Sequence, residues 1–352
     1  MSGSSTVEVD GSYGEGGGQI LRTAVAFSVI LQRPIRVSRI RAGRDVPGLR
    51  QQHVSTLQTL ARIFDADLRG AEIGSLEVSF TPGRLGVSRV TVNMKTAASI
   101  TLLLQAVIPA VALTRSRVSL DITGGTDVPW SPTFDYFSDL VRRAYGLLGV
   151  EFEAVVLRRG YYPRGGGRAT VKVEPAMGVR AIGLQRGGAS ARADLVSRCG
   201  GLPRHVAERQ MEAMARVLSA SGVELGLRFQ SEEAADSPGS SVMASVTGGG
   251  RLLGADGLGA KGRRAEEVGE KAAGSLIASI RSGASVDSNL ADMIAPWLSL
   301  ASGESSFLAP QVSPHLRTAL HIAKLFTGCD FSCVQDGSAI LVTVSPVSGH
   351  NA

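Results

Sequence analysis

A run of glycines between an acidic and a basic residue stands near the start of the chain. Residues 14–22 read GEGGGQILR, after a strand-like segment and at the start of an apolar stretch. Free backbone N–H groups at such a helix start bind anions, so Arg22 could hold a phosphate and Glu15 could bind a cation that bridges phosphates. The segment lacks the Gly-Lys-Ser/Thr of a P-loop and the dinucleotide fingerprint. A tight turn with a solvated carboxylate is the alternative interpretation.

A second cationic segment follows at residues 41–53, which read RAGRDVPGLRQQH. Three arginines, Arg44 among them, lie on a loop that glycine and proline make rigid and that ends at a helix start. The pattern indicates a polyanion contact or an ordinary surface cluster of arginines. Gln52 and His53, in the first turn of the following helix, could line the same site or face solvent.

The third candidate is His315, in the segment SPHLRT at residues 313–318. Pro314 is typical of a helix's first turn, which places His315 near a helix N-terminus, where anions gather. We expect the positive end of the helix dipole to keep this imidazole neutral, as a nucleophile or base requires. A polar first-turn residue is the alternative, and His321 is expected to pack.

Two loops carry weaker signals. Residues 124–132, GGTDVPWSP, form a strand-end loop whose aromatic residue and prolines could stack a base or cap the core. Residues 160–167, GYYPRGGG, form a basic, aromatic glycine loop that suits a nucleic-acid backbone without being specific for one. No Ser/His/Asp motif stands out.

The elements that position these residues follow a recurring order. Hydrophobic periodicity predicts helices at 19–31, 51–64, 98–113, 134–148, 265–281, 290–301 and 314–326, and strands at 35–40, 76–80, 87–92, 118–122, 152–157, 169–173, near 331 and at 340–344. This order predicts an α+β fold with three repeated units of two helices and about four strands. Residues 180–264 do not fit it, and we expect them to form an inserted, smaller α+β domain with a helix at 205–219 and a strand at 224–229.

Composition excludes several classes of protein. The chain has 352 residues, 43% of them hydrophobic, with a mean hydropathy of +0.12, so we expect a folded protein of about two domains. The 37 basic residues exceed the 31 acidic ones by only six, and all but five are arginine, whose forked guanidinium suits phosphate. The 43 glycines, without a triplet period, indicate sharp turns and close backbone approaches.

Three cysteines, an odd number, argue against a disulfide framework or a structural zinc site. The start of the chain lacks a signal-peptide pattern, and the apolar stretch at 97–113 is interrupted by polar residues, so we expect it to be buried core. These features predict a soluble, cytoplasmic protein without a membrane partner.

Taken together, the motifs closely resemble those of the RNA 3′-terminal phosphate cyclases, in order and spacing, from Asp10 to Val344. The motifs are EGGGQILR at 15–22, RAGR at 41–44 with PGL at 47–49 and QH at 52–53, GGTD at 124–127, YP and GGG at 162–167, PRHVAER at 203–209, LAD at 290–292 and PHLRT at 314–318. The loop at 125–132 looks like the archaeal branch of that family.

The resemblance implies a main domain of three units, residues 1–180 and 265–352, with an inserted domain at 181–264. It also implies a reaction in which a histidine attacks the α-phosphate of ATP and forms a histidine–AMP intermediate. AMP then passes to an RNA 3′-phosphate, and the neighbouring 2′-hydroxyl displaces it to leave a 2′,3′-cyclic phosphate. The expected ligands are ATP, Mg²⁺ or Mn²⁺, and RNA with a 3′-phosphate; a homodimer is left open.

Carried over to this chain, the resemblance makes His315 the nucleophile, Glu15 the metal-contacting carboxylate and Asp292 a residue of the adenosine site. The expected ATP and phosphate contacts are Arg22, Arg44, Gln52, His53, Gly16, Gly17, Gly18 and Gln19. The chain departs from the family pattern at three positions. They are Val46, where lysine is common, Ala98, where glycine is frequent, and Ala319, where asparagine is usual.

Two other classes of function remain open at this point. A cyclase-like RNA-binding or ribosome-assembly protein would not be catalytic, but such relatives lack the nucleophilic histidine that His315 matches. A small-molecule transferase on a similar repeated fold, such as an enolpyruvyl transferase, would not need a histidine at this position. Protein-bound AMP distinguishes the cyclase from both.

Overall fold

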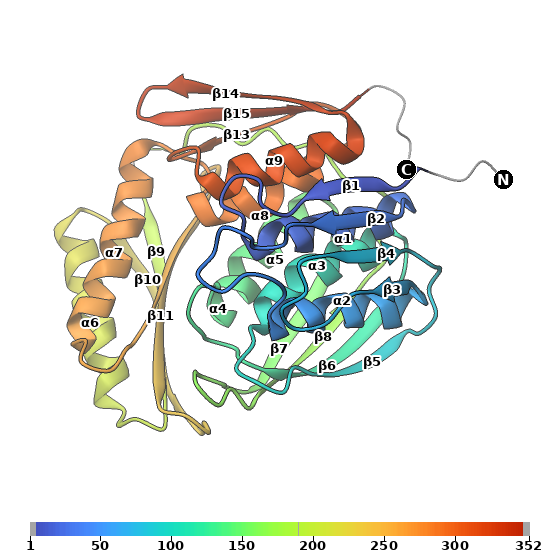
Figure 1. Ribbon diagram of the computed structural model, residues 1–352. Coiled ribbons are helices and arrows are strands. Elements are labelled where there is room, and N and C mark those ends of the chain that lie inside the picture. The colour runs from blue at the N-terminus through green and yellow to red at the C-terminus, as the bar shows by residue number, and fades with distance from the viewer. Residues whose placement is uncertain (1–4, 189, 348–352) are drawn as a thin grey trace.

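The computed structural model describes residues 5–188 and 190–347, and it has the expected α+β composition. Helices occupy the centre of the larger part of the molecule, with three small sheets around them (Figure 1). The central helix α3 (Ile100–Leu113) is apolar on almost every side, and Leu103, Val107 and Ile108 are fully buried. This confirms that the apolar stretch is core. Within the described residues, no helix is long and apolar enough to cross a membrane.

The first sheet, in the order β1-β2-β4-β3, is accompanied by helices α1 and α2. Strands β1 and β2 are parallel, and the other two pairs are antiparallel. The element bounds are β1 (Val7–Asp10), α1 (Gly18–Leu31), β2 (Ile35–Ser38), α2 (Gln51–Phe64), β3 (Asp67–Arg69) and β4 (Val78–Thr81). The helix predicted at 51–64 is confirmed at both ends. Asp65, in a left-handed conformation, follows its last residue.

The second sheet, in the order β5-β6-β8-β7, has the same pattern of one parallel pair followed by two antiparallel pairs. Its strands are β5 (Arg89–Asn93), β6 (Val118–Gly124), β7 (Phe152–Arg158) and β8 (Gly167–Val173). The helix predicted at 134–148 is helical as α4 (Phe134–Tyr136), a π-helical segment η1 (Phe137–Val141) and α5 (Arg142–Leu147).

The third sheet has three strands, in the order β13-β15-β14, where the sequence predicted about four. In place of a fourth strand, the chain at Gly183 pairs in parallel with Ser306 of β13 through a single isolated bridge. The elements are α8 (Ser288–Leu298), β13 (Ser305–Ala309), α9 (Pro314–Thr327), β14 (Asp330–Asp336) and β15 (Ala339–Ser345).

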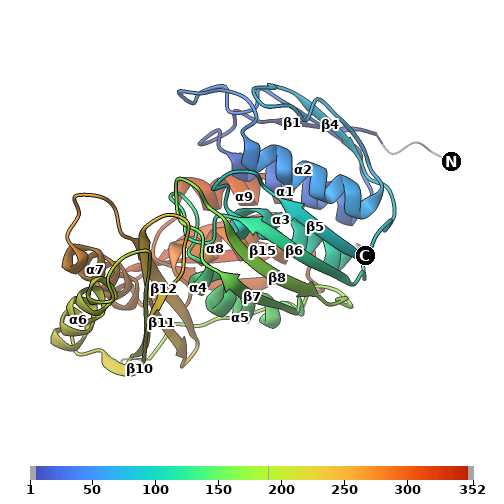
Figure 2. The same cartoon turned by 90° about the horizontal axis from the view of Figure 1, so that it is seen from below.

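A fourth sheet, in the order β10-β9-β11-β12, forms the separate lobe at the left of Figures 1 and 2. Its elements are β9 (Arg192–Gly200), α6 (His205–Ala220), β10 (Glu224–Glu233), β11 (Gly239–Gly248), β12 (Arg251–Leu258) and α7 (Ala265–Ser282). The sequence grouped α7 with the third unit. Instead α7 packs beside α6, and Val268 and Leu276 of α7 share an apolar cluster with Met214 and Leu218 of α6.

Candidate active site

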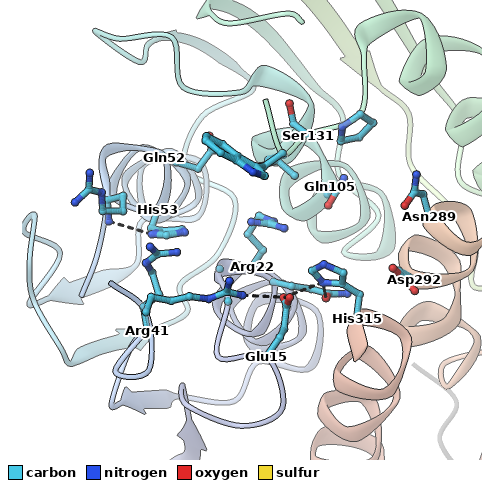
Figure 3. A pocket seen from close by; sticks show the side chains of 18 of the residues that line it. Glu15, Arg22, Arg41, Gln52, His53, Gln105, Ser131, Asn289, Asp292 and His315 are labelled. Atoms are coloured by element: carbon cyan, nitrogen blue, oxygen red, sulfur yellow. Dashed lines mark hydrogen bonds and ion pairs between the residues drawn. The ribbon is translucent and has the colours of Figure 1, made fainter. Parts of the chain in front are cut away.

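A cavity of about 960 Å³ opens where the N-terminal ends of α1, α2, α8 and α9 face one another (Figure 3). Helix starts carry partial positive charge and unpaired N–H groups, so this arrangement favours an anionic ligand. The cavity brings together almost every site residue expected from the sequence: Glu15, Gly17, Gly18, Gln19, Arg22, Arg44, Gln52, His53, Asp292 and His315. Gly16 does not line it but is buried beside it.

The glycine run leaves room for the side chains around it. A Cβ atom at Gly18 would lie 2.2 Å from Nε2 of His53, and one at Gly17 would lie 2.4 Å from Oε1 of Glu15. Gly16 has a φ of +58°, which side chains other than glycine adopt only with strain. No described side chain caps the N-terminus of α1 at Gly17, so the first N–H groups of that helix are available to a ligand.

The nucleophile candidate His315 is held through one ring nitrogen. Its Nδ1 lies 2.8 Å from Oε1 of Glu15 and 2.8 Å from Oε1 of Gln19, so Nδ1–H donates to these oxygens (Figure 3). Nε2 has no hydrogen-bond partner among the described residues. This arrangement fixes the tautomer whose free lone pair is on Nε2.

One contact in the structure opposes the effect that the helix end was expected to have on His315. The hydrogen bond to Glu15, despite the opposing effect of burial, raises the pKa of His315 above its ordinary value. The sequence had predicted a neutral imidazole, kept so by the helix end. The carboxylate of Glu15 favours the protonated ring instead, and only the structure shows that contact. Burial would raise the pKa of Glu15, but His315, Arg44 and Arg22 lower it.

Arg22 provides a partly buried cation at the centre of the site (Figure 3). Burial lowers its pKa to about 10, against the opposing charge of Glu15, so it stays protonated at neutral pH. Its buried Nε–H has no hydrogen-bond partner among the described residues. Arg44, which also lines the cavity, donates a hydrogen bond of 3.2 Å to Oε2 of Glu15. An unsatisfied guanidinium beside open helix starts is the environment that a phosphate group satisfies.

His53 is a neutral residue in the basic half of the cavity. Burial, then the charges of Arg22, Arg41 and Arg50, lower its pKa to about 3. Its Nδ1 accepts the N–H of Arg50 at 3.0 Å, which leaves the proton on Nε2, the atom that faces Gly18. His53 can therefore donate one hydrogen bond toward the site without adding charge.

The side chain of Gln52 is already paired. Its Nε2 donates to the carbonyl of Ser99 at 3.1 Å, and its Oε1 accepts the N–H of Ser99 at 2.7 Å. These two bonds connect the start of α2 to the residue that caps α3. Its Nε2 retains a second N–H beyond these two bonds, and the predicted phosphate contact of Gln52 stays a prediction.

An acidic half lies opposite the arginines. Oδ1 of Asp292 accepts a hydrogen bond from the Ser313 hydroxyl at 2.7 Å, and that hydroxyl in turn accepts the N–H of Leu316 at 2.9 Å. Asp292 thus supports the cap that begins α9 and positions His315. Burial raises the pKa of Asp292 to about 7, although Ser313 and His315 oppose the shift.

The structure also places residues in the cavity that were not among the expected site residues. They are Arg41, Asp45, Val46, Arg50, Leu102, Gln105, Trp130, Ser131, Pro132, Asp256, Asn289 and Met293. The arginine loop and the loop at 124–132 carried a signal for some of them. Asp256 had none, because it comes from β12 of the fourth sheet. Val46 is half-exposed at the cavity wall.

A cavity of this size, with one basic half and a histidine held by a carboxylate, suits the binding of phosphate groups. A sequence model of the family described as "RNA 3'-terminal phosphate cyclase" matches residues 13–333. The chain belongs to that family.

Curated relatives extend over nearly the whole chain. The protein named RNA 3'-terminal phosphate cyclase from Staphylothermus marinus is 42% identical, over 91% of this chain and 92% of its own length. The proteins with the same name from Pyrococcus abyssi and Pyrobaculum aerophilum are 41% and 37% identical, over 92% and 98% of this chain and 93% and 99% of their own lengths.

Proposed function

We propose that this protein is an ATP-dependent RNA 3′-terminal phosphate cyclase, a ligase-type nucleotidyl transferase that works through a histidine–AMP intermediate. The observation that carries this proposal is His315, whose Nδ1 is held by Glu15 at 2.8 Å while Nε2 stays free in a cavity of nucleotide size. Membership of the family and the names of the relatives support the same activity.

In the first step the Nε2 lone pair of His315 attacks the α-phosphorus of ATP. An N–P bond forms, the bond to the β-phosphate oxygen breaks, and pyrophosphate leaves. The imidazole becomes cationic in this step, and Glu15 at Nδ1 stabilises that charge. Because only the neutral ring has the free electron pair, the raised pKa of His315 makes the step favour higher pH.

The basic half of the cavity would hold the triphosphate. Arg22, Arg44 and the N–H groups at the start of α1 face the charge that accumulates on the phosphate oxygens during transfer. Donors that are fixed in place before the reaction stabilise that charge without reorganising. Asp292, in the acidic half, would face the nucleoside.

A divalent cation fits this donor set only together with the nucleotide. Glu15 is the carboxylate nearest His315, and within the described residues no cluster of three metal-binding side chains exists. Mg²⁺ and Mn²⁺ are commonly bound by one or two carboxylates together with substrate phosphates, so we propose that Glu15 contributes such a ligand. When bound, the cation would neutralise phosphate charge.

In the second step an oxygen of the RNA 3′-phosphate attacks the AMP phosphorus, and the N–P bond to His315 breaks. In the third, the 2′-hydroxyl oxygen attacks the 3′-phosphorus, its proton passes to a base, and AMP leaves. The product is the 2′,3′-cyclic phosphodiester. DNA lacks the 2′-hydroxyl and cannot complete this last step.

We also propose the domain division expected from the sequence, with one change. The main domain comprises three units, because the bridge from Gly183 to β13 repeats the parallel-then-antiparallel order of the first two sheets. The inserted domain begins near residue 181. The packing of α7 on α6, and of Ala284 in the same apolar cluster, leads us to extend it from 264 to about residue 284.

Incubation with ATP labelled at the α-phosphate tests the activity. Wild-type protein is expected to retain acid-labile label, and His315→Ala is expected to retain none. The matched control is His321→Ala on the same helix, since His321 stacks on Tyr13 at 3.6 Å between ring centroids and does not line the cavity. Unlabelled wild-type protein that still binds RNA would favour the non-catalytic alternative, and label that persists in His315→Ala would overturn the assignment.

A further inference from the structure

One aromatic side chain at the cavity is almost fully exposed. Trp130 is 96% exposed, more than any other large apolar side chain that the structure describes, and it lines the cavity that contains His315. Its φ is +63°, a left-handed conformation that is uncommon for a bulky residue. Tryptophan is usually largely buried, and backbone strain of this kind concentrates at functional sites.

The loop that carries Trp130 is held at both ends. On one side, buried Asp127 pairs with Arg159 at 3.0 Å. On the other, the N–H of Thr133 donates to Oδ2 of Asp256 at 2.6 Å, and the Ser131 hydroxyl closes the turn on the carbonyl of Val128 at 2.8 Å. The indole is therefore exposed although hydrogen bonds and an ion pair hold the loop on both sides of it.

The position of Trp130 in the cavity indicates which part of the substrates it can contact. The site has buried residues at one end, where Asp292 is 9% exposed, and the indole at the open side. A nucleotide that reacts with His315 places its nucleoside toward Asp292 and its phosphates toward Arg22. The RNA phosphate must then approach the AMP phosphorus opposite the bond to Nε2, from the open side, because displacement at phosphorus proceeds in line.

We propose that Trp130 is the stacking platform for the 3′-terminal base of the RNA substrate, an inference that rests on the proposed function. The indole presents a flat face beside the path that the terminal nucleoside takes into the cavity. Stacking on an aromatic side chain tolerates any base, since every base has a π-face. It would hold the terminal ribose with its phosphate near His315 without restricting the RNA sequence.

Binding in the absence of ATP tests the proposal. The ligand is a short single-stranded RNA with a 3′-phosphate, compared with the same RNA whose terminal nucleotide is abasic. In a Trp297→Phe background Trp130 is the remaining tryptophan, and its emission is expected to fall on binding of the complete RNA. Trp130→Ala is expected to weaken binding of the complete RNA about 10-fold, whereas Trp130→Phe retains most of the affinity.

The abasic RNA completes a double-mutant cycle. Wild-type protein is expected to bind it about as weakly as Trp130→Ala binds the complete RNA, with no further loss when both changes are combined. Leu227→Ala, which removes another exposed apolar side chain outside the cavity, is the control for general surface effects. If the loss of affinity from Trp130→Ala and the loss from the abasic RNA multiply when the two changes are combined, the indole does not contact the terminal base. That result would overturn the proposal.

A second measurement separates the RNA base from the adenine of ATP. The affinity for ATP, measured without RNA, is expected to change less than the affinity for RNA in Trp130→Ala. A larger loss for ATP would make Trp130 part of the nucleotide site and would also overturn the proposal. RNA binding is measured without ATP, so its result does not depend on whether protein-bound AMP forms. Failure of the stacking proposal is therefore distinguishable from failure of the proposed activity.

Discussion

Oε1 of Glu15 lies 2.8 Å from Nδ1 of His315, and this contact joins the loop before the first helix to the start of the last one. The same carboxylate accepts Arg44 through its other oxygen at 3.2 Å. Glu15 therefore orients His315 and connects it to the basic half of the cavity. Removing the carboxylate should change both the rate of AMP transfer to the protein and its dependence on pH.

The first prediction concerns this pH dependence. In wild-type protein the rate of label formation is expected to rise with pH through a pKa above the ordinary value of histidine, because the hydrogen bond to Glu15 favours the protonated ring. Glu15→Gln loses that stabilisation, so its transition is expected at lower pH and its maximal rate about 100-fold lower. Rapid-quench measurement of label between pH 5 and 9, a range of roughly two units either side of neutrality, checks both effects.

Glu15→Asp is the matched variant, since it keeps the charge but retracts it by one methylene. Its transition should lie closer to that of wild type than the transition of Glu15→Gln does. An identical pH profile for all three proteins would show that Glu15 does not control the protonation of His315.

The second prediction concerns the close approach at Gly18. A Cβ atom there would meet Nε2 of His53 at 2.2 Å and Nη1 of Arg22 at 3.1 Å, so Gly18→Ala must displace both side chains. We expect label formation to fall about 100-fold, as misplacement of positioning residues by an ångström does. The measurement is the initial rate of labelling at saturating ATP.

The control for this variant is Gly274→Ala. Gly274 lies in α7, and nothing lies within 4 Å of the Cβ that alanine would add there. Alanine in a helix interior stabilises by about 0.5–1 kcal/mol relative to glycine, so the thermal midpoint should rise while labelling stays unchanged. Equal activity of the two variants would contradict the steric argument for Gly18.

The third prediction concerns the buried ion pairs of Arg159. This side chain is 4% exposed and pairs with Asp127 at 3.0 Å and with Asp135 at 2.9 Å. Arg159→Met leaves the buried carboxylate of Asp127 without its cation, which costs about 3–5 kcal/mol of unfolding free energy. Urea denaturation followed by circular dichroism gives the value.

Arg69→Met removes an exposed pair instead, since Arg69 and Asp67 lie on the surface at 2.9 Å. Exposed pairs are screened by water and salt, so this variant should leave the denaturation midpoint almost unchanged. A loss for Arg159→Met as small as that for Arg69→Met would show that Asp127 finds another partner.

The fourth prediction concerns Asp256, which reaches the cavity from the lobe of the fourth sheet. Its Oδ2 accepts the N–H of Thr133, three residues after Trp130. Asp256→Asn keeps an acceptor oxygen and should bind the 3′-phosphorylated RNA nearly as wild type does. Asp256→Ala releases the end of the loop and should bind it several-fold more weakly, as loss of a buried hydrogen bond of about 1 kcal/mol predicts. Equal affinity of both variants would mean that this bond does not position Trp130.

Much of the local structure could be predicted from the sequence. The limits of α2 and α9 follow from apolar periodicity and from Pro314 and Gly328 at the two ends of α9, all of which are local signals. The glycine run, the arginine loop and His315 were recognisable because their chemistry depends on neighbours in the chain. Strands β9, β11 and β12 were not predicted, since the packing of a small lobe, and not a strong alternation, determines them.

By itself, the sequence determined which residue types stand at which helix starts and, through ordered motifs, the family to which the chain belongs. Only the tertiary structure decided that Glu15 reaches His315, that Asp256 enters the cavity from another sheet, and that the indole of Trp130 is left in solvent. The physical reason is that helix limits and turns depend on adjacent residues. Distances between side chains on different elements, and the pKa values that depend on them, are set by how those elements pack.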